Sequence, residues 1–257
     1  MNTFFPDTWH MLLRHIRTTL RIPIWIVITL VQPFIWLALY GQLFRKVVEI
    51  PGFGAKSYIQ FLTPGVVVMT ALFGAMWSGM GLVQDLEAGI VDRLLATPVN
   101  RGALIAARVL HAALTVAVQS IIILLVAMAF GARFPGGLGG FLAILLLAAL
   151  LASGIAALST GLALLTRREE TLIAIVQFFG MPLTFLSTAF MASALMPGWI
   201  RMVARGNPVN WSVNAARSAM LGEHWSSVLS YGALLTIFAL AACALATQAF
   251  TLYRRAA

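Results

Sequence analysis

Long apolar runs alternate with short charged segments along the whole chain. A helix needs about 20 apolar residues to cross the hydrocarbon core of a bilayer. Six segments reach that length, at residues 23–44, 58–82, 103–130, 141–165, 171–192 and 226–252. We therefore predict an all-α polytopic membrane protein, with one transmembrane domain over residues 1–257 and six transmembrane helices.

The segment before the first apolar run, residues 7–21, has a two-faced helical pattern. Apolar residues including Trp9, Leu12 and Leu20 share one face, and basic residues including Arg14 share another. Such a basic amphipathic helix lies in the membrane interface with its apolar side in lipid. Alternatively, the basic residues only fix the orientation of the first span.

Small residues recur at helical spacing inside two of the apolar runs. They are Gly74, Ser78 and Gly81 in the second run and Ser153, Ala157 and Gly161 in the fourth. Small side chains let helix backbones approach each other closely in lipid. We expect both stripes to be helix-packing surfaces.

Composition supports a membrane protein and excludes other classes. Hydrophobic residues make up 61% of the chain and charged residues 10%, whereas soluble domains carry roughly 25% charged residues. The net charge is +9, but the basic residues gather at the ends of apolar runs, which fits anionic lipid headgroups and not nucleic acid. The single cysteine, Cys243, excludes an internal disulfide, and four dispersed histidines predict no metal site.

The distribution of positive charge predicts the orientation. The termini and the second and fourth loops hold ten Lys and Arg residues, Arg108 among them, and the opposite side holds seven, Arg217 among them. Positive residues are enriched in cytoplasmic loops. The count therefore favours cytoplasmic termini.

Several kinds of chemistry are missing from the sequence. There is no G-x-x-x-x-G-K-[ST] phosphate-binding loop, and the only lysines are Lys46 and Lys56, so the chain has no ATPase site of that kind. The six apolar cores contain no Asp or Glu, which disfavours a proton-driven carrier. The sequence shows neither paired carboxylates nor a nucleophile with a base, so it gives no support for a membrane enzyme. His111 is expected to be a polar tip near the interface.

Neutral polar and aromatic stripes occur inside two spans. The first span carries Thr29, Gln32, Trp36 and Tyr40 on one face; the fifth carries Gln177, Met181, Thr184 and Thr188, with Phe178 and Phe185 adjacent. Such surfaces can line a path for a large amphipathic molecule. The alternative is an ordinary helix interface with interhelical hydrogen bonds.

Three segments carry a resemblance to a known family. They are "YIQFLTPGVVVMTALFG" at 58–74, "QDLEAGIVDRLLATPVNRGALIAARVL" at 84–110 and "MPLTFLSTAFMASALMPGWIRMVARGNPVNWSVNAARSAMLG" at 181–222. Over nearly its whole length the chain resembles the membrane subunit of type-2 ABC exporters of the daunorubicin-resistance type. The resemblance implies a permease of six spans preceded by an interfacial helix.

The resemblance also implies partners and a location. Two copies of a separate ATPase subunit, which bind ATP and Mg, would work with two permease copies, identical or paralogous. This chain would bind no cofactor itself. The substrate path would lie between the permeases, in the inner (plasma) membrane of a bacterium, with both termini cytoplasmic.

The same resemblance assigns residues to coupling with the ATPase. A short cytoplasmic coupling helix at about 85–98 would act through Asp85, Glu87, Asp92, Arg93 and Thr97, with Gly89 allowing close backbone approach and Pro98 ending the helix. Arg167 and Glu169 in the second cytoplasmic loop are further candidate contacts. Leu86 stands where family members often carry a basic residue. Alternatively, these charges only fix topology.

The third segment resembles short extracellular helices that dip toward the membrane. Met196, Trp199, Asn207 and Trp211 would close the exit of the path, or the two tryptophans would only anchor the segment at headgroup depth.

The leading hypothesis is a permease without catalytic activity that belongs to an ATP-driven exporter. It would move amphipathic drug-like, antibiotic or lipid-like molecules out of the cell. Alternatives are a polysaccharide or lipid-linked glycan exporter, a gradient-driven carrier and, third, an enzyme acting on lipid-linked substrates.

Overall fold

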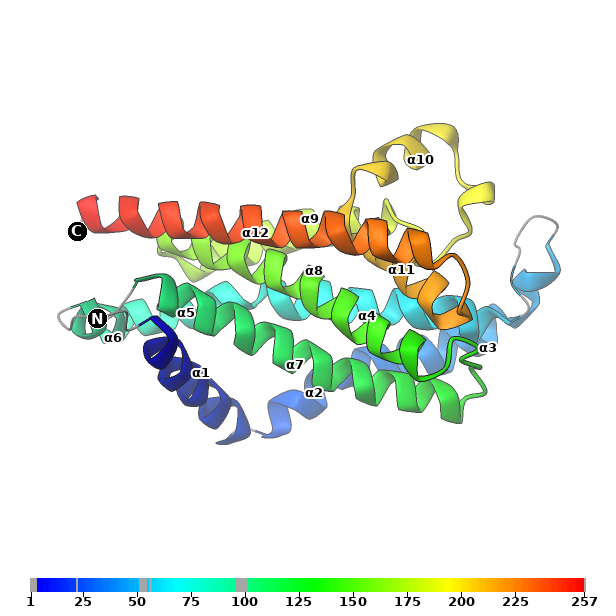
Figure 1. Ribbon diagram of the computed structural model, residues 1–257, viewed down its shortest axis with the longest axis horizontal. Helices are drawn as coiled ribbons and strands as arrows, with labels where there is room; N and C mark the ends of the chain where they lie inside the picture. The colour runs from blue at the N-terminus through cyan, green and yellow to red at the C-terminus, as the bar shows by residue number, and fades with distance from the viewer. Residues whose placement is uncertain (1–3, 22, 51–54, 56, 96–100, 257) are drawn as a thin grey trace.

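The computed structural model describes residues 4–21, 23–50, 55, 57–95 and 101–256, and every regular element within them is helical, as predicted. The longer helices run along one axis as a bundle (Figure 1). The α-helices are α1 (Phe4–Arg21), α2 (Pro23–Ile35), α3 (Gly41–Leu43), α4 (Tyr58–Met76), α5 (Ser78–Glu87), α6 (Ile90–Leu95), α7 (Arg101–Ala129), α8 (Gly137–Thr166), α9 (Glu169–Phe185), α10 (Gly198–Arg205), α11 (Pro208–Leu221) and α12 (Trp225–Ala256). Shorter turns are the π-helical Trp36–Tyr40 and the 3-10 helices Arg45–Glu49 and Ser193–Leu195.

Four helical segments among the described residues are long and apolar enough to cross a membrane: Tyr58–Glu87, Gly102–Ala129, Gly137–Thr166 and Trp225–Thr251. They correspond to the second, third, fourth and sixth predicted spans. The first predicted span contains the shorter apolar helix Val27–Leu43.

The fifth predicted span is shorter than expected. Helix α9 ends at Phe185, so the prediction of helix up to residue 192 is wrong for its last part. Ser187 and Thr188 lie in turns, where their side chains bond to backbone or to α11 and not along a helix face. Such side-chain bonds compete with the helical hydrogen-bond pattern.

The start of α1 and the end of α12 lie toward the same end of the bundle. Helix α6 also lies at that end, while α3 and α10 lie toward the other end (Figure 1). Helix α1 runs across the direction of the long helices. The predicted interfacial helix is therefore a separate element attached to the bundle.

Helix α8 is the centre of the packed core, in contact with α4, α5, α7, α11 and α12. A Cβ atom added to Gly161 would lie 3.2 Å from the Cα of Ala246 on α12, and one added to Gly154 would overlap the Phe238 ring. The small stripe of the fourth predicted span is therefore a close helix contact, as expected.

A hydrogen-bonded side chain from α8 also supports the break between α4 and α5. The Ser159 hydroxyl donates to the carbonyl of Met76 at 2.5 Å and accepts from the amide of Gly79 at 3.0 Å. A Cβ at Gly79 would lie only 2.5 Å from the Ser159 carbonyl oxygen. Gly79, which the sequence pattern did not single out, is thus the close contact of α5 with α8.

The apolar face of α1 is divided between the bundle and the outside. Met11 and Leu12 are buried against α7 and its neighbours, whereas Trp9 and Leu20 are 57% and 66% exposed. The expectation that the whole apolar face points into lipid is therefore wrong for Leu12.

Candidate functional site

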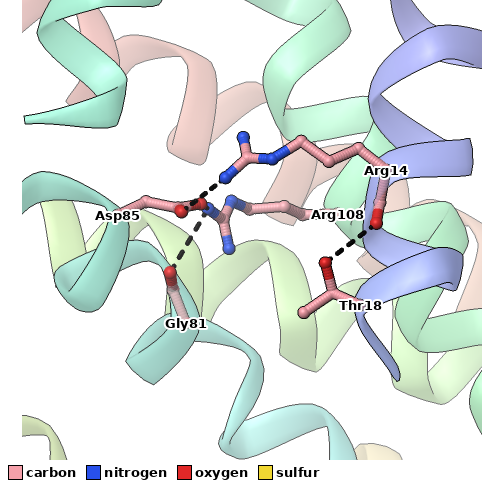
Figure 2. Close-up of polar contacts among 5 residues, drawn as sticks. All are labelled: Arg14, Thr18, Gly81, Asp85 and Arg108. Atoms are coloured by element: carbon pink, nitrogen blue, oxygen red, sulfur yellow. Dashed lines mark hydrogen bonds and ion pairs between the residues drawn. The ribbon is translucent and has the colours of Figure 1, made fainter. Parts of the chain in front are cut away.

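Three charged side chains meet where α1 packs on α5 and α7, and we call Arg14, Asp85 and Arg108 the polar junction (Figure 2). The Arg14 guanidinium donates to Asp85 Oδ1 at 2.8 Å, and Arg108 pairs with the other carboxylate oxygen. Arg108 also donates to the carbonyl of Gly81 at 3.4 Å. One carboxylate therefore links three helices.

Local sequence explains how the junction forms. Gly81 precedes Asp85 by one helical turn, so its carbonyl and the Asp85 carboxylate lie on the same face of α5 and accept from the same Arg108 guanidinium. Arg108 is 5% exposed, and its Nε is buried without a hydrogen-bond partner. Burial of a charged group is costly unless it is paired, so Asp85 is the group that keeps Arg108 acceptable inside the bundle.

Two histidines lie beside the junction. The rings of His15 and His111 have centroids 5.7 Å apart, and His111 Nε2 shares a 2.8 Å hydrogen bond with Thr19 Oγ1. Burial and the positive charge of Arg108 lower the pKa of His15 to about 3. His15 is therefore neutral at physiological pH, and the junction has two positive charges against one negative charge.

A cavity of about 500 Å³ lies against the junction, and we call it the junction cavity. Its wall includes the junction residues, both histidines and Gln119. A second cavity of about 120 Å³ extends it along α2 and α4. The two share Thr29, Gly74, Trp77 and Gln119 as lining residues.

Three of the four path residues predicted on the first span line these cavities. Thr29, Gln32 and Trp36 form part of the wall of the smaller one. Trp36 and Tyr40 belong to the π-helical turn that follows Pro33, a residue without the amide hydrogen that an α-helix needs. Thr29, Gln32 and Trp36 thus face a cavity, and Thr29 also accepts an interhelical hydrogen bond from Gln119 of α7 at 3.0 Å, while Tyr40 is not among the lining residues of either cavity.

Aromatic rings continue from Trp36 in both directions as an aromatic row: Phe185, Phe190, Trp36, Tyr40, Phe44, Tyr58 and Phe61. The centroid of Trp36 lies 4.2 Å from that of Tyr40 and 4.8 Å from that of Phe190. At its end the Arg217 guanidinium lies 3.8 Å from the centroid of the Phe61 ring. The row connects the first and fifth predicted spans through Phe190, which the sequence pattern did not single out.

The path residues predicted on the fifth span do not share one surface. Gln177, Phe178, Met181 and Phe185 are exposed, whereas Thr184 and Thr188 are buried. Thr184 donates to the carbonyl of Gly180, and Thr188 donates to Asn210 at 2.9 Å. Phe178, Met181 and Phe185 form an outward apolar face of α9, Gln177 is an exposed polar residue of the same helix, and the two threonines lie inside the fold.

The predicted coupling helix is divided into two pieces. Helix α5 ends at Glu87, Gly89 has φ +65°, and α6 follows as Ile90–Leu95. Glu87 and Arg93 are exposed at the end of the bundle, while Val91 anchors α6 in a buried apolar cluster.

The other coupling candidates have different surroundings. Asp85 points inward to the two arginines, and its side chain is 15% exposed. Asp92 belongs to α6, but its side chain is not described. Thr97 and Pro98 lie outside the described residues.

Arg167 and Glu169 flank the turn between α8 and α9. Arg167 has φ 53°, and its guanidinium carbon lies 4.4 Å from the centroid of the Tyr253 ring on α12. Glu169 is the first residue of α9 and is half-buried. Arg167 thus connects the turn to the last helix.

The predicted gate residues are spread over α10, α11 and the turn before them. Met196 is buried and Trp199 is 64% exposed. Asn207 caps α11 by accepting from the Val209 amide, and it donates to the carbonyl of Leu183 at 2.7 Å. Trp211 Nε1 donates to the Arg205 carbonyl at 2.6 Å. Asn207 and Trp211 therefore hold α11 to its neighbours.

The sequence prediction missed two polar surfaces. Arg108, His111, Thr115 and Gln119 recur at helical spacing on α7 and line the junction cavity. Asn207, Asn210, Asn214 and Arg217 recur on α11, where Arg217 donates to the Thr188 carbonyl at 2.8 Å. Both arginines were counted as loop charges, and this was wrong because each points into the fold. The helical spacing of these polar residues, three to four positions apart, is the sequence signal that would have revealed both surfaces.

Comparisons with known proteins agree on one family. The family model for ABC-2 type transporters matches residues 6–221. A transport permease, ycf38, of Cyanophora paradoxa is 31% identical over 206 residues, covering 80% of this chain and 71% of the relative. The ycf38 permease of Porphyra purpurea is 28% identical over 207 residues, with the same coverage. The daunorubicin resistance ABC transporter permease protein DrrB1 of Streptomyces coeruleorubidus is 24% identical over 200 residues, covering 78% of this chain and 70% of the relative.

Proposed function

The chain belongs to the ABC-2 type transporter family, and from this membership we propose that it is the membrane-spanning permease subunit of an ATP-driven exporter. The observation that carries the proposal is the exposed, charged end of α5 and α6, at Glu87 and Arg93, in a chain without a phosphate-binding loop. Such a surface suits contact with a separate ATPase subunit. ATP and Mg would bind to that partner, and this chain would have no catalytic site.

The polar junction suggests how a push on this end would travel. Asp85 and Glu87 lie on the same helix, and Asp85 is paired with Arg14 of α1 and Arg108 of α7. A displacement of α5 would therefore move α1 and α7 with it. Rigid-body movement of packed elements is a common route from a local contact to a change in access.

The proposed assembly has two permease copies and two ATPase copies in the inner membrane of a bacterium, with both termini cytoplasmic. In this proposal the α2–α3 segment and α9 are the two shorter of six crossings, α1 lies in the interface, and α10 and α11 form the re-entrant outer part. The outward apolar face of α9, which includes Phe178, Met181 and Phe185, is available to lipid or to the second permease copy.

We propose an amphipathic drug-like, antibiotic or lipid-like molecule as the substrate. The cavities combine apolar and aromatic walls with a few hydroxyl and amide groups, which suits a molecule of this kind. The daunorubicin resistance permease among the relatives supports the same class.

A polysaccharide or lipid-linked glycan is the second candidate substrate. The aromatic row that includes Trp36, Tyr40 and Phe44 favours it, because aromatic faces suit the apolar faces of sugar rings. Competition between glycan and drug-like probes for transport would distinguish the two classes.

Reconstitution with the ATPase partner tests the proposed function. Transport should require both the partner and ATP, and transport by this chain alone under an ion gradient would contradict the proposal. Glu87→Arg should leave assembly and ATP hydrolysis intact and strongly reduce transport, because it reverses the charge of the exposed α5 end. Glu223→Arg, an exposed acid outside this end of the bundle, is the matched control. Unchanged transport by Glu87→Arg would remove the coupling role.

A further inference from the structure

We propose that the junction cavity binds the acidic head of an amphipathic molecule, a phosphate ester or a carboxylate, while its apolar tail lies along α2 toward Trp36. The binding claim concerns this chain alone. That the bound molecule is also the exported one rests on the proposed function.

The first argument is the charge of the cavity wall. Arg14 and Arg108 face a single carboxylate, Asp85, and no other Asp or Glu is among the described residues that line the cavity. Because His15 is neutral, the excess is one positive charge. An anion is the ligand that balances it.

The second argument is an unused donor. Arg108 is 5% exposed and lines the cavity, yet its Nε is buried without a hydrogen-bond partner. Buried polar groups in folded proteins are nearly always paired, so each unpaired one calls for an explanation. A small movement of the Arg108 guanidinium would let Nε donate a charge-assisted bond to a phosphate or carboxylate oxygen in the cavity.

The third argument is the loss of charge along the two cavities. The wall near α1 includes the junction residues and both histidines, whereas the lining of the continuation has no charged side chain and combines Val66, Met69, Phe73 and Trp36 with neutral polar residues. A head followed by a tail matches that order. The shared residue Gln119 has a buried Oε1 without a partner, and it marks the transition.

The fourth argument is the way the space is kept open. Gly74 and Gly81 face the cavities, and a Cβ added to either would meet only a polar side-chain atom, of Gln119 at 3.7 Å or of Arg108 at 3.5 Å, besides Val116 near Gly74. Larger residues at these positions would fill the space. Gly74 and Gly81 therefore face α7 at ordinary contact distance, without the close backbone approach that Gly161 makes to α12.

Binding to the purified chain, without ATPase or ATP, tests the proposal. We expect decyl phosphate to bind at least about tenfold more tightly than decyl maltoside, which lacks the charge, or inorganic phosphate, which lacks the tail. Loss of a charged hydrogen-bonding partner is worth about 1.5–3 kcal/mol, which corresponds to tenfold or more in affinity. Equal binding of decyl phosphate and decyl maltoside would overturn the head site, and equal binding of inorganic phosphate would overturn the tail site.

Two variants and one control locate the site. Arg108→Gln removes the head charge and should weaken decyl phosphate at least about tenfold; Gly74→Leu keeps every charge but fills the tail cavity and should also weaken it. Arg45→Gln, an exposed arginine outside the cavity, should bind as the unmodified chain does. If Arg108→Gln does not fold, Gly74→Leu still decides, and unchanged binding by that variant would place the molecule elsewhere.

A second experiment asks whether the acidic head belongs to a membrane lipid. It measures whether phosphatidylglycerol displaces decyl phosphate from the chain in phosphatidylcholine nanodiscs. If phosphatidylglycerol displaces decyl phosphate, a membrane lipid occupies the site; if it does not, the site selects single-chain acidic molecules. Both results support an acidic-head site. Because no transport is measured, failure of the binding leaves the proposed function open, and failure of ATP-driven transport leaves the binding result intact.

Discussion

The α8–α12 interface and the polar junction both contain glycine, but glycine has opposite effects in the two regions. At the interface, Gly154 and Gly161 lie against Phe238, Ala239 and Ala246, and a Cβ at Gly161 would come within 3.2 Å of backbone. At the junction, Gly81 faces only a side-chain nitrogen of Arg108 at 3.5 Å. One region is closed and the other open.

The difference teaches that the residue opposite decides what a small-residue stripe does. Alanine opposite glycine lets two helices touch, which suits association in lipid. Long polar side chains such as Arg108 and Gln119 opposite glycine keep the helices apart and leave the cavity. The spacing of small residues in the sequence therefore predicts free space beside a helix. It does not predict whether a second helix or a cavity fills that space.

The largest expected effect comes from removing the carboxylate of Asp85 at the polar junction. Asp85→Asn leaves Arg108 buried without a negative partner, and breaking a buried pair on one side costs about 3–5 kcal/mol. Unfolding in mixed detergent micelles should show a loss of this size. Glu87→Gln, an exposed acid on the same helix, should change the free energy of unfolding by less than about 0.5 kcal/mol. Equal effects would mean that Asp85 does not compensate Arg108.

A leucine scan at the glycines tests the closed and open regions directly. Gly161→Leu should destabilise by about 1–3 kcal/mol because the Cα of Ala246 leaves no space for the side chain. Gly74→Leu should be nearly neutral, since the adjoining cavity can accept the side chain and leucine is a better helix former than glycine. Thermal unfolding of the two variants side by side measures the contrast. A larger loss for Gly74→Leu would reverse the assignment of closed and open regions.

Acid conditions should lower the free energy of unfolding through His15, which lies beside the polar junction. His15 faces Arg14, Arg108, His111 and Asp85, and its pKa is lowered to about 3, below the unfolded value of about 6.5. The unfolded state therefore binds a proton that the folded state does not, and stability is complete above pH 6.5 and falls as the pH drops from 6.5 toward 3.

The slope should approach about 1.4 kcal/mol per pH unit in that window. His15→Gln should flatten this slope, while His10→Gln, an exposed histidine of the same helix, should not. Unfolding titrations at pH 7.5, 6.0 and 5.0 measure the difference, and parallel curves for all three proteins would contradict the assignment.

The sequence predicted the long helices well because an apolar run of that length has few other possible structures. Helices α7, α8 and α12 begin and end within a few residues of the predicted spans. The end of α9 was not predicted, because it depends on bonds from Thr188 and Asn207 across a gap in sequence to other helices. Local pattern carries no information on such distant partners.

The candidate site was predictable only in part. The exposed charges Glu87 and Arg93 follow from the interruption between two apolar runs. The polar junction does not, because Asp85 is 71 positions from Arg14 and 23 from Arg108. The family assignment was confirmed by comparison, whereas the coupling and path roles stay predictions.

Gly89→Ala is the smallest expected effect and isolates a third use of glycine. Gly89 has φ +65°, and apart from its chain neighbours no atom of the described residues lies within 4 Å of the position that a Cβ would take there, so close approach to these residues does not explain the glycine. Only the left-handed backbone between α5 and α6 requires glycine there, and an alanine in that conformation costs about 1 kcal/mol. Gly198→Ala is the matched control, since Gly198 has the same open surroundings but lacks the positive φ. Unfolding midpoints should fall for Gly89→Ala and hold for Gly198→Ala; if Gly89→Ala is equally stable, the turn is free to rearrange, and α6 would not transmit a push on its exposed side to Asp85.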